Sequence, residues 1–528
     1  MPISTSCDFD ITIFCPGNIE SPAQTMSIAI TPIIAIDRKA RTPLHRQIYD
    51  AYRDAIVRGT LRPGQRVPST RGLASELGVS RIPVLGAYAQ LMAEGYFQSR
   101  VGAGTSISWS LPDQRVVGEP RGVRTVATRA SASMRRIAKH RSLPGSIENP
   151  PWCRGWGPFG VGQVASDQFP FRVWNSLVAR HCRATGSKSV DYGPPMGLKN
   201  LRDAVASYLR TARGVRCEAE QVMIVSGSQQ ALDISVRVLL DRGNKIWVEN
   251  PGYRYARHVF ALNGCRVVPV PVDNEGLQVA AGVKRCPDAR AALVTPSHQY
   301  PLGVTLSASR RLQLLDWAAR SGSWILEDDY DSEYRYEGMP ISSLQGLDCN
   351  SRVVYIGTFS KVLFPSLRLG YLVIPNDLIE RVLTVRLAMD IGPATLSQAV
   401  LADFIREGHF SRHIRRMRLL YHERRNALVE NLEKEFGNAA KIIGEQAGMH
   451  LCLVLNGICD RDVVNRAART NLWLVPLSSS YIGKSPQHGF VLGFGSTPAN
   501  EMANAVRKLR AVLSLGKSRA RTREERQP

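Results

Sequence analysis

The chain has 528 residues, of which 44% are hydrophobic and 21% are charged, so it is long enough for roughly two to four globular domains. No run of about eighteen apolar residues occurs, and no basic segment opens the chain, which argues against a membrane span and a secretory signal peptide. The net charge of +23 favours polyanionic partners, and the alternative is an ordinary soluble protein from a basic proteome. The ten cysteines are scattered without metal-ligand spacing, so we expect a cytoplasmic protein with reduced thiols and no metal.

Apolar patterning and local charge divide the chain into five segments. A low-charge N-terminal extension (1–37) precedes a compact helical segment (38–108), and a flexible basic linker (109–151) follows. Strand-like and helix-like runs alternate over 152–515, which predicts an α/β domain, and 516–528 form a charged tail without regular structure. The expected strands are continuous apolar runs, suited to a sheet buried on both faces: Val222–Ser226, Lys245–Val248, Ala291–Thr295, Trp324–Leu326 and Val353–Ile356.

The helical segment begins with the pattern of a helix–turn–helix. A first helix is expected over 43–58 from an apolar stripe at helical spacing, formed by Leu44, Ile48, Tyr52 and Ile56. Ser69 and Ser80 are placed to cap two further short helices. Pro83 falls in the first turn of the second of these, where a missing N–H does no harm.

A hairpin completes the pattern. Residues 96–105 have the pattern of a hairpin, with Gly102 and Gly104 at its bend. Helix–turn–helix plus hairpin predicts a winged helix, in which the helix that starts at Arg81 enters the major groove of double-stranded DNA. The alternative is a small helical domain that binds another protein or nothing.

The segment resembles GntR-type regulators in the run Pro63-Gly64-x-x-x-Pro68-Ser69-x-Arg71-x-Leu73-Ala74-x-x-Leu77-Gly78-Val79-Ser80-Arg81, followed by Ala87-Tyr88-x-x-Leu91-x-x-Glu94-Gly95-Tyr96. The resemblance implies that Arg71 and Arg81 contact DNA and that Ser80 meets a phosphate. Thr70, Gly102 and Gly104 are further candidates for DNA contact. The chain departs from the usual pattern at Ile82-Pro83 and Leu85-Gly86, which replace polar residues and leave fewer hydrogen-bond donors for base edges.

In the α/β domain the most informative residue is Lys361. Pyridoxal 5'-phosphate requires an amine for a Schiff base, a carboxylate on the pyridinium nitrogen, a phosphate cup, a partner for its ring and a donor to its phenolate oxygen. Lys361 is the candidate amine, and Asp328, at the end of a predicted strand, is the candidate carboxylate. Tyr330 is a candidate donor and Tyr253 a candidate ring partner, although an acidic surface loop and a core tyrosine are the plain alternatives.

A phosphate cup is expected where a strand, a small-residue turn and a helix start follow one another at 225–233. Free N–H groups at Gly227, Ser228 and Gln229 and the helix dipole favour an anion there. The hydroxyls of Thr358 and Ser360 and the guanidinium of Arg368 are expected to complete the cup.

These motifs, in this order, resemble the fold-type I aminotransferases over about 155–515. In that family the tyrosine that matches Tyr192 reaches the phosphate in the neighbouring subunit, which implies a homodimer. The Asn-Pro-Thr-Gly of many members reads Tyr300-Pro301-Leu302-Gly303 here, so one contact to the phenolate oxygen is missing. His298 is interpreted as a structural hydrogen-bonding residue.

A GntR winged helix, a basic linker and an aminotransferase-like domain together resemble the MocR subgroup of regulators. The stretch 488–494 lacks the arginine with which aminotransferases bind the substrate α-carboxylate, unless Arg254 or Arg257 substitutes for it. The favoured hypothesis is a regulator that binds pyridoxal phosphate on Lys361 and responds to the cofactor alone or to an amino-acid or amine effector. The alternative is an active aminotransferase, with Lys361 as its catalytic lysine and an appended DNA-binding domain.

Overall fold

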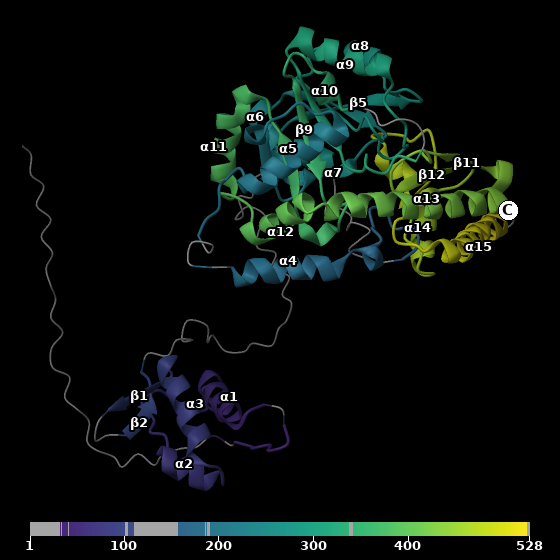
Figure 1. Cartoon of the computed structure of the whole chain (residues 1–528). Coiled ribbons are helices and arrows are strands. Elements are labelled where there is room, and N and C mark those ends of the chain that lie inside the picture. The colour runs from purple at the N-terminus through teal and green to yellow at the C-terminus, as the bar shows by residue number, and fades with distance from the viewer. Residues whose placement is uncertain are drawn as a thin grey trace, which may run out of the picture. The chain divides into compact units, whose positions relative to one another are not determined.

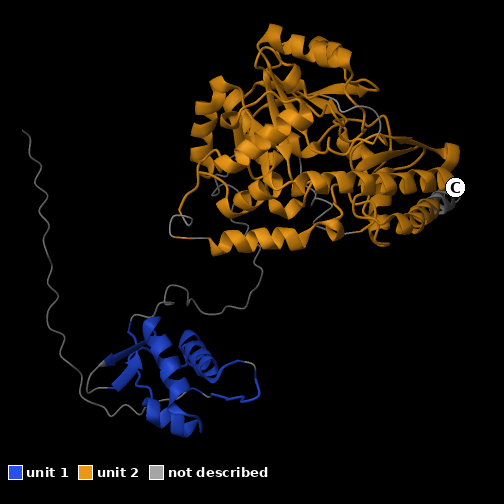
Figure 2. Ribbon diagram, in the orientation of Figure 1, with its two compact units in different colours: residues 1–137 blue, residues 138–528 orange. Residues whose placement is uncertain are grey.

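A computed structural model of the chain describes residues 32, 34–40, 42–100, 104–109, 157–184, 186, 191–336 and 342–524. The chain divides into two compact units, residues 1–137 and 138–528, which Figure 2 shows in different colours. Most of the expected basic linker lies outside the described residues. Within the described ranges, none of the helices combines the length and the apolar character that crossing a bilayer requires.

The described residues of unit 1 form three helices and a hairpin, as the sequence predicts (Figure 1). The expected apolar stripe of the first helix is buried at three of its four positions, and Leu44 is partly exposed. Tyr52, Tyr88 and Phe97 meet edge to face in the centre of the core, with ring centroids 5.1–5.8 Å apart. The elements are α1 (Leu44–Val57), α2 (Thr70–Glu76), α3 (Arg81–Ala93), β1 (Phe97–Arg100) and β2 (Gly104–Ile107).

The two serines expected to cap α2 and α3 behave differently. The Ser69 hydroxyl accepts a hydrogen bond from the Gly72 N–H at 3.1 Å, so the predicted cap of α2 forms. Ser80 occupies the N-cap position of α3, but its side chain makes no capping hydrogen bond. The expected capping role of Ser80 is therefore wrong, and its hydroxyl is not used to hold the helix.

The hairpin pairs β1 with β2 in antiparallel register, from Phe97 opposite Ile107 to Arg100 opposite Gly104. The segment before α2 joins this ribbon, because Gly64 and Val67 donate backbone hydrogen bonds to Ile107 and Thr105. Gly104 has a φ of +83°, the left-handed conformation that favours glycine in a bend. Gly102 lies outside the described residues.

Unit 2 is built on a sheet of eight strands in the order β3-β10-β9-β8-β7-β4-β5-β6. The run from β9 to β5 is parallel, whereas β10 is antiparallel to both β3 and β9, and β6 is antiparallel to β5. All five predicted strands are present, within one to three residues of their expected ends. The strands are β3 (Val222–Val225), β4 (Lys245–Asn250), β5 (Arg266–Asp273), β6 (Gly276–Leu277), β7 (Ala291–Val294), β8 (Trp324–Asp329), β9 (Val353–Thr358) and β10 (Gly370–Val373).

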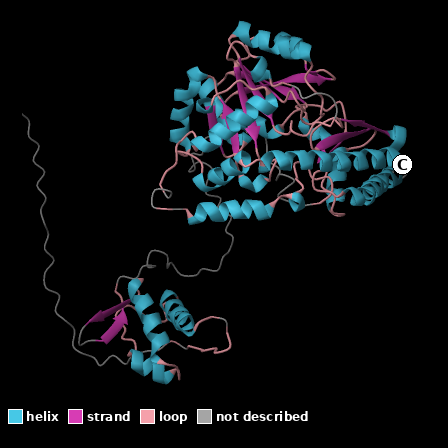
Figure 3. Cartoon of the chain, viewed as in Figure 1, coloured by secondary structure: helices cyan, strands magenta, loops and turns pink. Residues whose placement is uncertain are grey.

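Helices cover both faces of this sheet (Figure 3). Alternate residues of a strand point to opposite faces, so Met223 packs in one core with α6, α7 and α11, while Val222 packs in another with α5. Trp247 stacks on Trp317 of α9 at a centroid distance of 4.0 Å. The helices are α4 (Phe171–Arg183), α5 (Lys199–Arg213), α6 (Ser228–Leu239), α7 (Arg254–Leu262), α8 (Val279–Arg285), α9 (Ala308–Ser321), α10 (Leu344–Leu347), α11 (Ile379–Met389) and α12 (Thr395–Arg406).

A second, antiparallel sheet in unit 2 has the order β11-β12-β14-β13 and was not among the expected strands. Its elements are β11 (Ala440–Ile443), β12 (His450–Leu455), β13 (Val475–Pro476) and β14 (Gly489–Gly493), with the helices α13 (His409–Phe436), α14 (Asp460–Ala468) and α15 (Ala499–Glu524). The backbone of α15 is helical through Glu524, so the expectation of an irregular tail from 516 is wrong up to that residue. The alanine, arginine and glutamate of this stretch are good helix formers.

Candidate functional site

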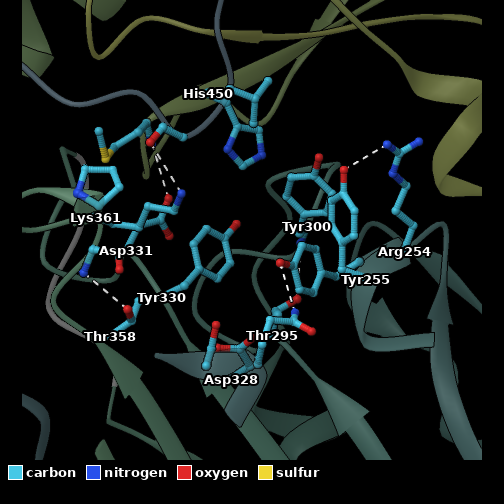
Figure 4. Close-up of a pocket in the computed structure, with 18 of the residues that line it drawn as sticks. Arg254, Tyr255, Thr295, Tyr300, Asp328, Tyr330, Asp331, Thr358, Lys361 and His450 are labelled. Carbon is cyan, nitrogen blue, oxygen red and sulfur yellow. Dashed lines mark hydrogen bonds between the residues drawn. The ribbon is translucent and has the colours of Figure 1, made fainter. Parts of the chain in front are cut away.

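A cavity of about 350 Å³ opens in unit 2 where the central parallel strands end. The residues that follow β4, β7, β8 and β9 contribute to its wall, as expected for the carboxyl edge of an open α/β sheet. Figure 4 shows Asp328, Tyr330, Thr358 and Lys361 around this space. Of the predicted cofactor residues, nine line the cavity: Ser228, Gln229, Tyr253, Asp328, Tyr330, Thr358, Ser360, Lys361 and Arg368.

Three successive acidic residues end β8, and their partners distinguish them. Glu327 accepts hydrogen bonds from the N–H groups of Leu344 and Gln345 at 2.8 and 2.9 Å. Asp329 accepts from the Arg213 guanidinium at 2.8 Å and from the Tyr355 hydroxyl at 2.5 Å. Asp328 points to the opposite face of the strand, toward the cavity.

Asp328 is 5% exposed, and its Oδ1 has no hydrogen-bond partner among the described residues. Burial raises the pKa of its carboxyl to about 7, and the charges of Asp329 and Glu249 act in the same direction. A buried carboxyl without a partner destabilises the fold unless another group pairs with it. The protonated nitrogen of a pyridine ring is such a group, so this residue fits the carboxylate that the sequence predicts.

Lys361 follows β9 and reaches the same cavity. Its Nζ lies 3.4 Å from the Gly162 carbonyl oxygen. Burial lowers the pKa of this amine, and the nearby carboxylates of Asp331 and Asp328 oppose the shift. A lowered pKa increases the fraction of neutral amine, the form that attacks a carbonyl. Gly162 has a φ of +79°, which favours glycine, and a Cβ there would displace the end of the lysine side chain.

The residues of the predicted phosphate cup lie together although they come from two distant segments, 227–229 and 358–368. Gly227, with a φ of +116°, leads into α6, so the first N–H groups of this helix face the cavity at Ser228 and Gln229. The Arg368 guanidinium lies 3.4 Å from the point where a Cβ on Gly227 would stand. Thr358 and Ser360 line the same space, with the Thr358 hydroxyl accepting from the Ser360 N–H at 3.2 Å. A helix N-terminus and a guanidinium that face one space favour an anion with several oxygens.

The two predicted tyrosines differ in what they contact. The Tyr253 hydroxyl accepts a hydrogen bond from Gln229 Nε2 at 3.1 Å, and burial raises its pKa above the usual range. This bond fixes the ring in the cavity wall, close to the expected phosphate. The Tyr330 hydroxyl donates to the His298 carbonyl at 2.9 Å, so its expected donation to a cofactor oxygen stays a prediction.

Behind Tyr330 lies a group of buried polar residues that the sequence analysis did not assign to the site. The His298 Nδ1 lies 3.1 Å from both carboxylate oxygens of Asp331, and Asp331 also accepts from the Met449 N–H at 3.2 Å. His450 packs against His298 at a centroid distance of 4.8 Å, and burial lowers its pKa well below the usual value. The interpretation of His298 as a hydrogen-bonding residue agrees with these contacts. The hydrogen bond from Met449 to Asp331 connects the loop after β8 with the start of β12, a contact that local sequence patterns do not predict.

Two arginines are candidate substitutes for the missing carboxylate clamp. Arg254 lines the cavity, and its Nη2 donates to the Tyr255 hydroxyl at 2.8 Å. Arg257 instead donates to the carbonyl oxygens of Gly252 at 3.0 Å and Tyr481 at 3.3 Å, and to that of Ser480. Arg257 therefore holds backbone together, and Arg254 is the candidate that faces the cavity.

Tyr192 is outside the cavity wall and 82% of its surface is exposed. The expected contact of Tyr192 with a second subunit stays a prediction.

The predicted DNA-contacting residues of unit 1 lie together at the starts of α2 and α3. Arg71, Ser80 and Arg81 are exposed. The Arg81 Nε donates to the Thr70 hydroxyl at 3.1 Å, which links the two helices and directs the guanidinium. Gly104 is exposed in the hairpin, the wing of the predicted winged helix.

Comparisons with known proteins agree with both halves of this description. The family model of bacterial regulatory proteins of the gntR family matches residues 44–107, and that of aminotransferase class I and II matches residues 157–487. The probable rhizopine catabolism regulatory protein MocR of Rhizobium meliloti is 38% identical over 492 residues, 92% of this chain and 97% of the relative. The chain belongs to the MocR family of GntR-type transcriptional regulators.

Another relative is the HTH-type pyridoxine biosynthesis transcriptional regulator PdxR of Corynebacterium glutamicum, 32% identical over 92% of this chain and 99% of its own. Among solved structures, the kynurenine aminotransferase of Pyrococcus horikoshii matches 73% of this chain and 98% of its own, with 25% identity and a TM-score of 0.67. The α-aminoadipate aminotransferase LysN of Thermus thermophilus matches 72% of this chain and 97% of its own, with 27% identity and a TM-score of 0.66. The predicted winged helix and fold-type I domain are thereby confirmed, and regulation is favoured over amino transfer.

Proposed function

We propose that this MocR-family regulator binds pyridoxal 5'-phosphate in the cavity of unit 2 and uses the bound state to control its binding of operator DNA in the cytoplasm. The cofactor supplies a carbonyl group that condenses with amines. The observation that carries the proposal is the carboxyl of Asp328, buried and without a partner at Oδ1 among the described residues. The positive charge of a pyridinium nitrogen would offset the free energy that burial of this carboxylate costs.

The other residues of the cavity have complementary roles in this proposal. Lys361 carries the cofactor through its amine, whose pKa burial lowers. Arg368, Thr358, Ser360 and the start of α6, which line the same cavity, hold the phosphate. Tyr253, fixed by Gln229, packs against the ring. Tyr330 is the proposed donor to the phenolate oxygen, a role in which its hydroxyl exchanges the hydrogen bond to the His298 carbonyl for one to the cofactor.

Arg254 is the proposed binding residue for an effector that carries both an amine and a carboxylate. Its guanidinium lines the same cavity as Lys361, and the fork of an arginine suits a carboxylate. The strand that would supply the usual carboxylate-binding arginine, β14, presents Phe490, Val491 and Leu492, which are buried. A carboxylate held by Arg254 would lie on a different side of the cavity from one held by an arginine of β14. We therefore expect an amino acid to bind in an orientation that does not support efficient amino transfer.

The proposed assembly is a homodimer in which Tyr192 contacts the phosphate site of the second subunit. Its 82% exposure in one chain is compatible with this role, because a side chain that reaches into a second subunit is exposed in the isolated chain. Two copies present two winged helices, which suits an operator with two half-sites.

The experiment is cofactor loading of the full-length chain. Incubation with pyridoxal phosphate is expected to give a visible absorption band, and borohydride reduction is expected to fix the cofactor mass on the peptide that contains Lys361. Lys361→Ala removes both signals, whereas Lys199→Ala, an exposed lysine of α5 paired with Asp203, leaves both unchanged. Labelling spread over several lysines, unaffected by Lys361→Ala, would contradict the proposal.

A further inference from the structure

The exposed side of α3 is unusually apolar over its first two turns. Ile82 is 78% exposed and Leu85 is 44% exposed, while Gly86 and Ala89 extend the same face. The opposite side of the helix supplies Val84, Ala87, Tyr88 and Leu91 to the core of unit 1. Ile82 and Leu85 belong to neither the core nor the partly buried residues packed against it. Packing of the core of unit 1 therefore does not explain why these two exposed positions carry large aliphatic side chains.

The surroundings of Ile82 and Leu85 are those of a surface that meets a polyanion. Arg71 and Arg81 flank them, and neither α2 nor α3 has an acidic residue in its first turn. Ser80 keeps its hydroxyl unused by the helix cap. Among the described residues exposed on the first two turns of α3, Arg81 is the one with a hydrogen-bonding side chain. The apolar face is thus continuous with the residues proposed to contact DNA.

We propose that Ile82 and Leu85 recognise the 5-methyl groups of thymines in the major groove of the operator, beside a guanine contacted by Arg81. This inference rests on the proposed DNA-binding function and deepens it to the choice of bases. In the major groove, thymine is the base that offers an apolar group, and aliphatic side chains contact that methyl. Ile82 and Leu85 are three residues apart, about 4.5 Å along the helix axis, so the thymines lie about one or two base pairs apart.

Arg81 is suited to guanine because Thr70 holds its Nε at 3.1 Å. Its two terminal nitrogens make no hydrogen bond to any of the described residues. Together, these two nitrogens can donate to guanine O6 and N7. A guanine contact fixes the helix in the groove, and the methyl contacts then distinguish thymine from cytosine at neighbouring positions. The departure of 82–86 from the polar pattern of GntR-type helices thereby becomes a means of base selection.

The test removes single methyl groups from DNA. A duplex is selected from a random-sequence pool by repeated binding to the full-length chain, and each thymine of its half-site is then replaced in turn by uracil, which lacks only the methyl. Two replacements are expected to weaken binding by about fourfold each, the fold-change that burial of one methyl or methylene group gives. Replacement of the other thymines is expected to leave the affinity within about twofold.

The same duplexes are then bound by Ile82→Ala and Leu85→Ala. Each variant is expected to lose the uracil effect at one thymine and to keep it at the other. This result would assign each side chain to the thymine methyl group that it contacts. Met92→Ala is the matched control, because Met92 is 39% exposed on the last turn of α3 and is expected to keep both effects. All three positions are exposed, so folding is expected to be unaffected.

The outcomes separate this inference from the proposed function. A selected half-site without thymine, or equal uracil effects in the wild type and both alanine variants, would overturn the inference while leaving DNA binding established. A change in self-association on Ile82→Ala, with no change in DNA affinity, would show that a second chain covers this face and would also overturn it. Failure to select any duplex would count against DNA binding itself.

Discussion

The cavity of unit 2 and the DNA-facing surface of unit 1 are built in opposite ways. The cavity gathers buried groups from segments as far apart as Gly162 and His450, and its central carboxyl is 5% exposed. The surface of unit 1 is formed by the neighbouring residues 70–86, which are largely exposed. Buried charges interact strongly with each other and with a ligand, whereas exposed ones are screened by water and salt. Substitutions in the cavity should therefore have large effects on cofactor binding, and those on α3 smaller ones on DNA binding.

The largest effect is expected for Asp328→Asn. Removal of one partner from a buried charge pair costs several kcal/mol, so the affinity for pyridoxal phosphate is expected to fall by about a hundredfold or more. Absorbance titration of the full-length variant measures this change. Its affinity for DNA in the absence of cofactor should equal that of the wild type, and a loss there would mean that the substitution disturbs more than the cavity.

The same residue predicts a pH dependence of stability in the cofactor-free chain. The pKa of Asp328 rises from 3.8 to about 7 on folding because the carboxyl is buried, so the folded state holds its proton more tightly than the unfolded state. The free energy of unfolding of the wild type, relative to Asp328→Asn, should then fall as pH rises from about 4 to about 7 and stay level above, by a few kcal/mol in all. Chemical unfolding at several pH values measures this difference. A difference that is constant with pH would contradict the assignment of Asp328 as an unpaired buried acid.

On the DNA side, Arg81→Ala should lower the affinity for the selected duplex by about tenfold or more and relax the choice of base at one position. Arg71→Ala should weaken binding to all sequences similarly. It should also make the slope of log affinity against log salt concentration shallower by about one, the effect of one lost phosphate contact. Titrations at several salt concentrations distinguish the two. If Arg71→Ala relaxed the base choice and Arg81→Ala did not, the roles of the two arginines would be exchanged.

The smallest effects separate the two serines of unit 1. Ser69→Ala should lower the free energy of unfolding by about 1 kcal/mol, because its hydroxyl caps α2. Ser80→Ala should leave stability within about 0.5 kcal/mol, because its hydroxyl makes no capping bond, yet weaken DNA binding by about threefold through one lost phosphate contact. Thermal unfolding and DNA titration of both variants provide the comparison. Equal losses of stability would show that Ser80 does cap α3.

The sequence predicts most of the elements of unit 1 and many residues of the cavity wall because their signals are local. A serine before a helix, a glycine at a bend and a lysine between hydroxyl residues can be recognised from neighbours in the chain. Contacts made at long range left no such signal. Gly162 supports Lys361 from 199 residues away, and the hydrogen bond between Met449 and Asp331 spans 118 residues. The Ser80 cap failed for a related reason, since a capping residue type does not determine which way its hydroxyl points.

The central claim is that one chain couples cofactor binding to DNA binding. The most direct test measures the affinity of the full-length chain for the selected duplex with and without pyridoxal phosphate, and its affinity for pyridoxal phosphate with and without that duplex. Two coupled sites must change each other's affinity by the same factor, expected here to be about fivefold or more, and Lys361→Ala should lose the effect of the cofactor on DNA. Unchanged DNA affinity in a chain whose Lys361 is shown to carry the cofactor would contradict the claim.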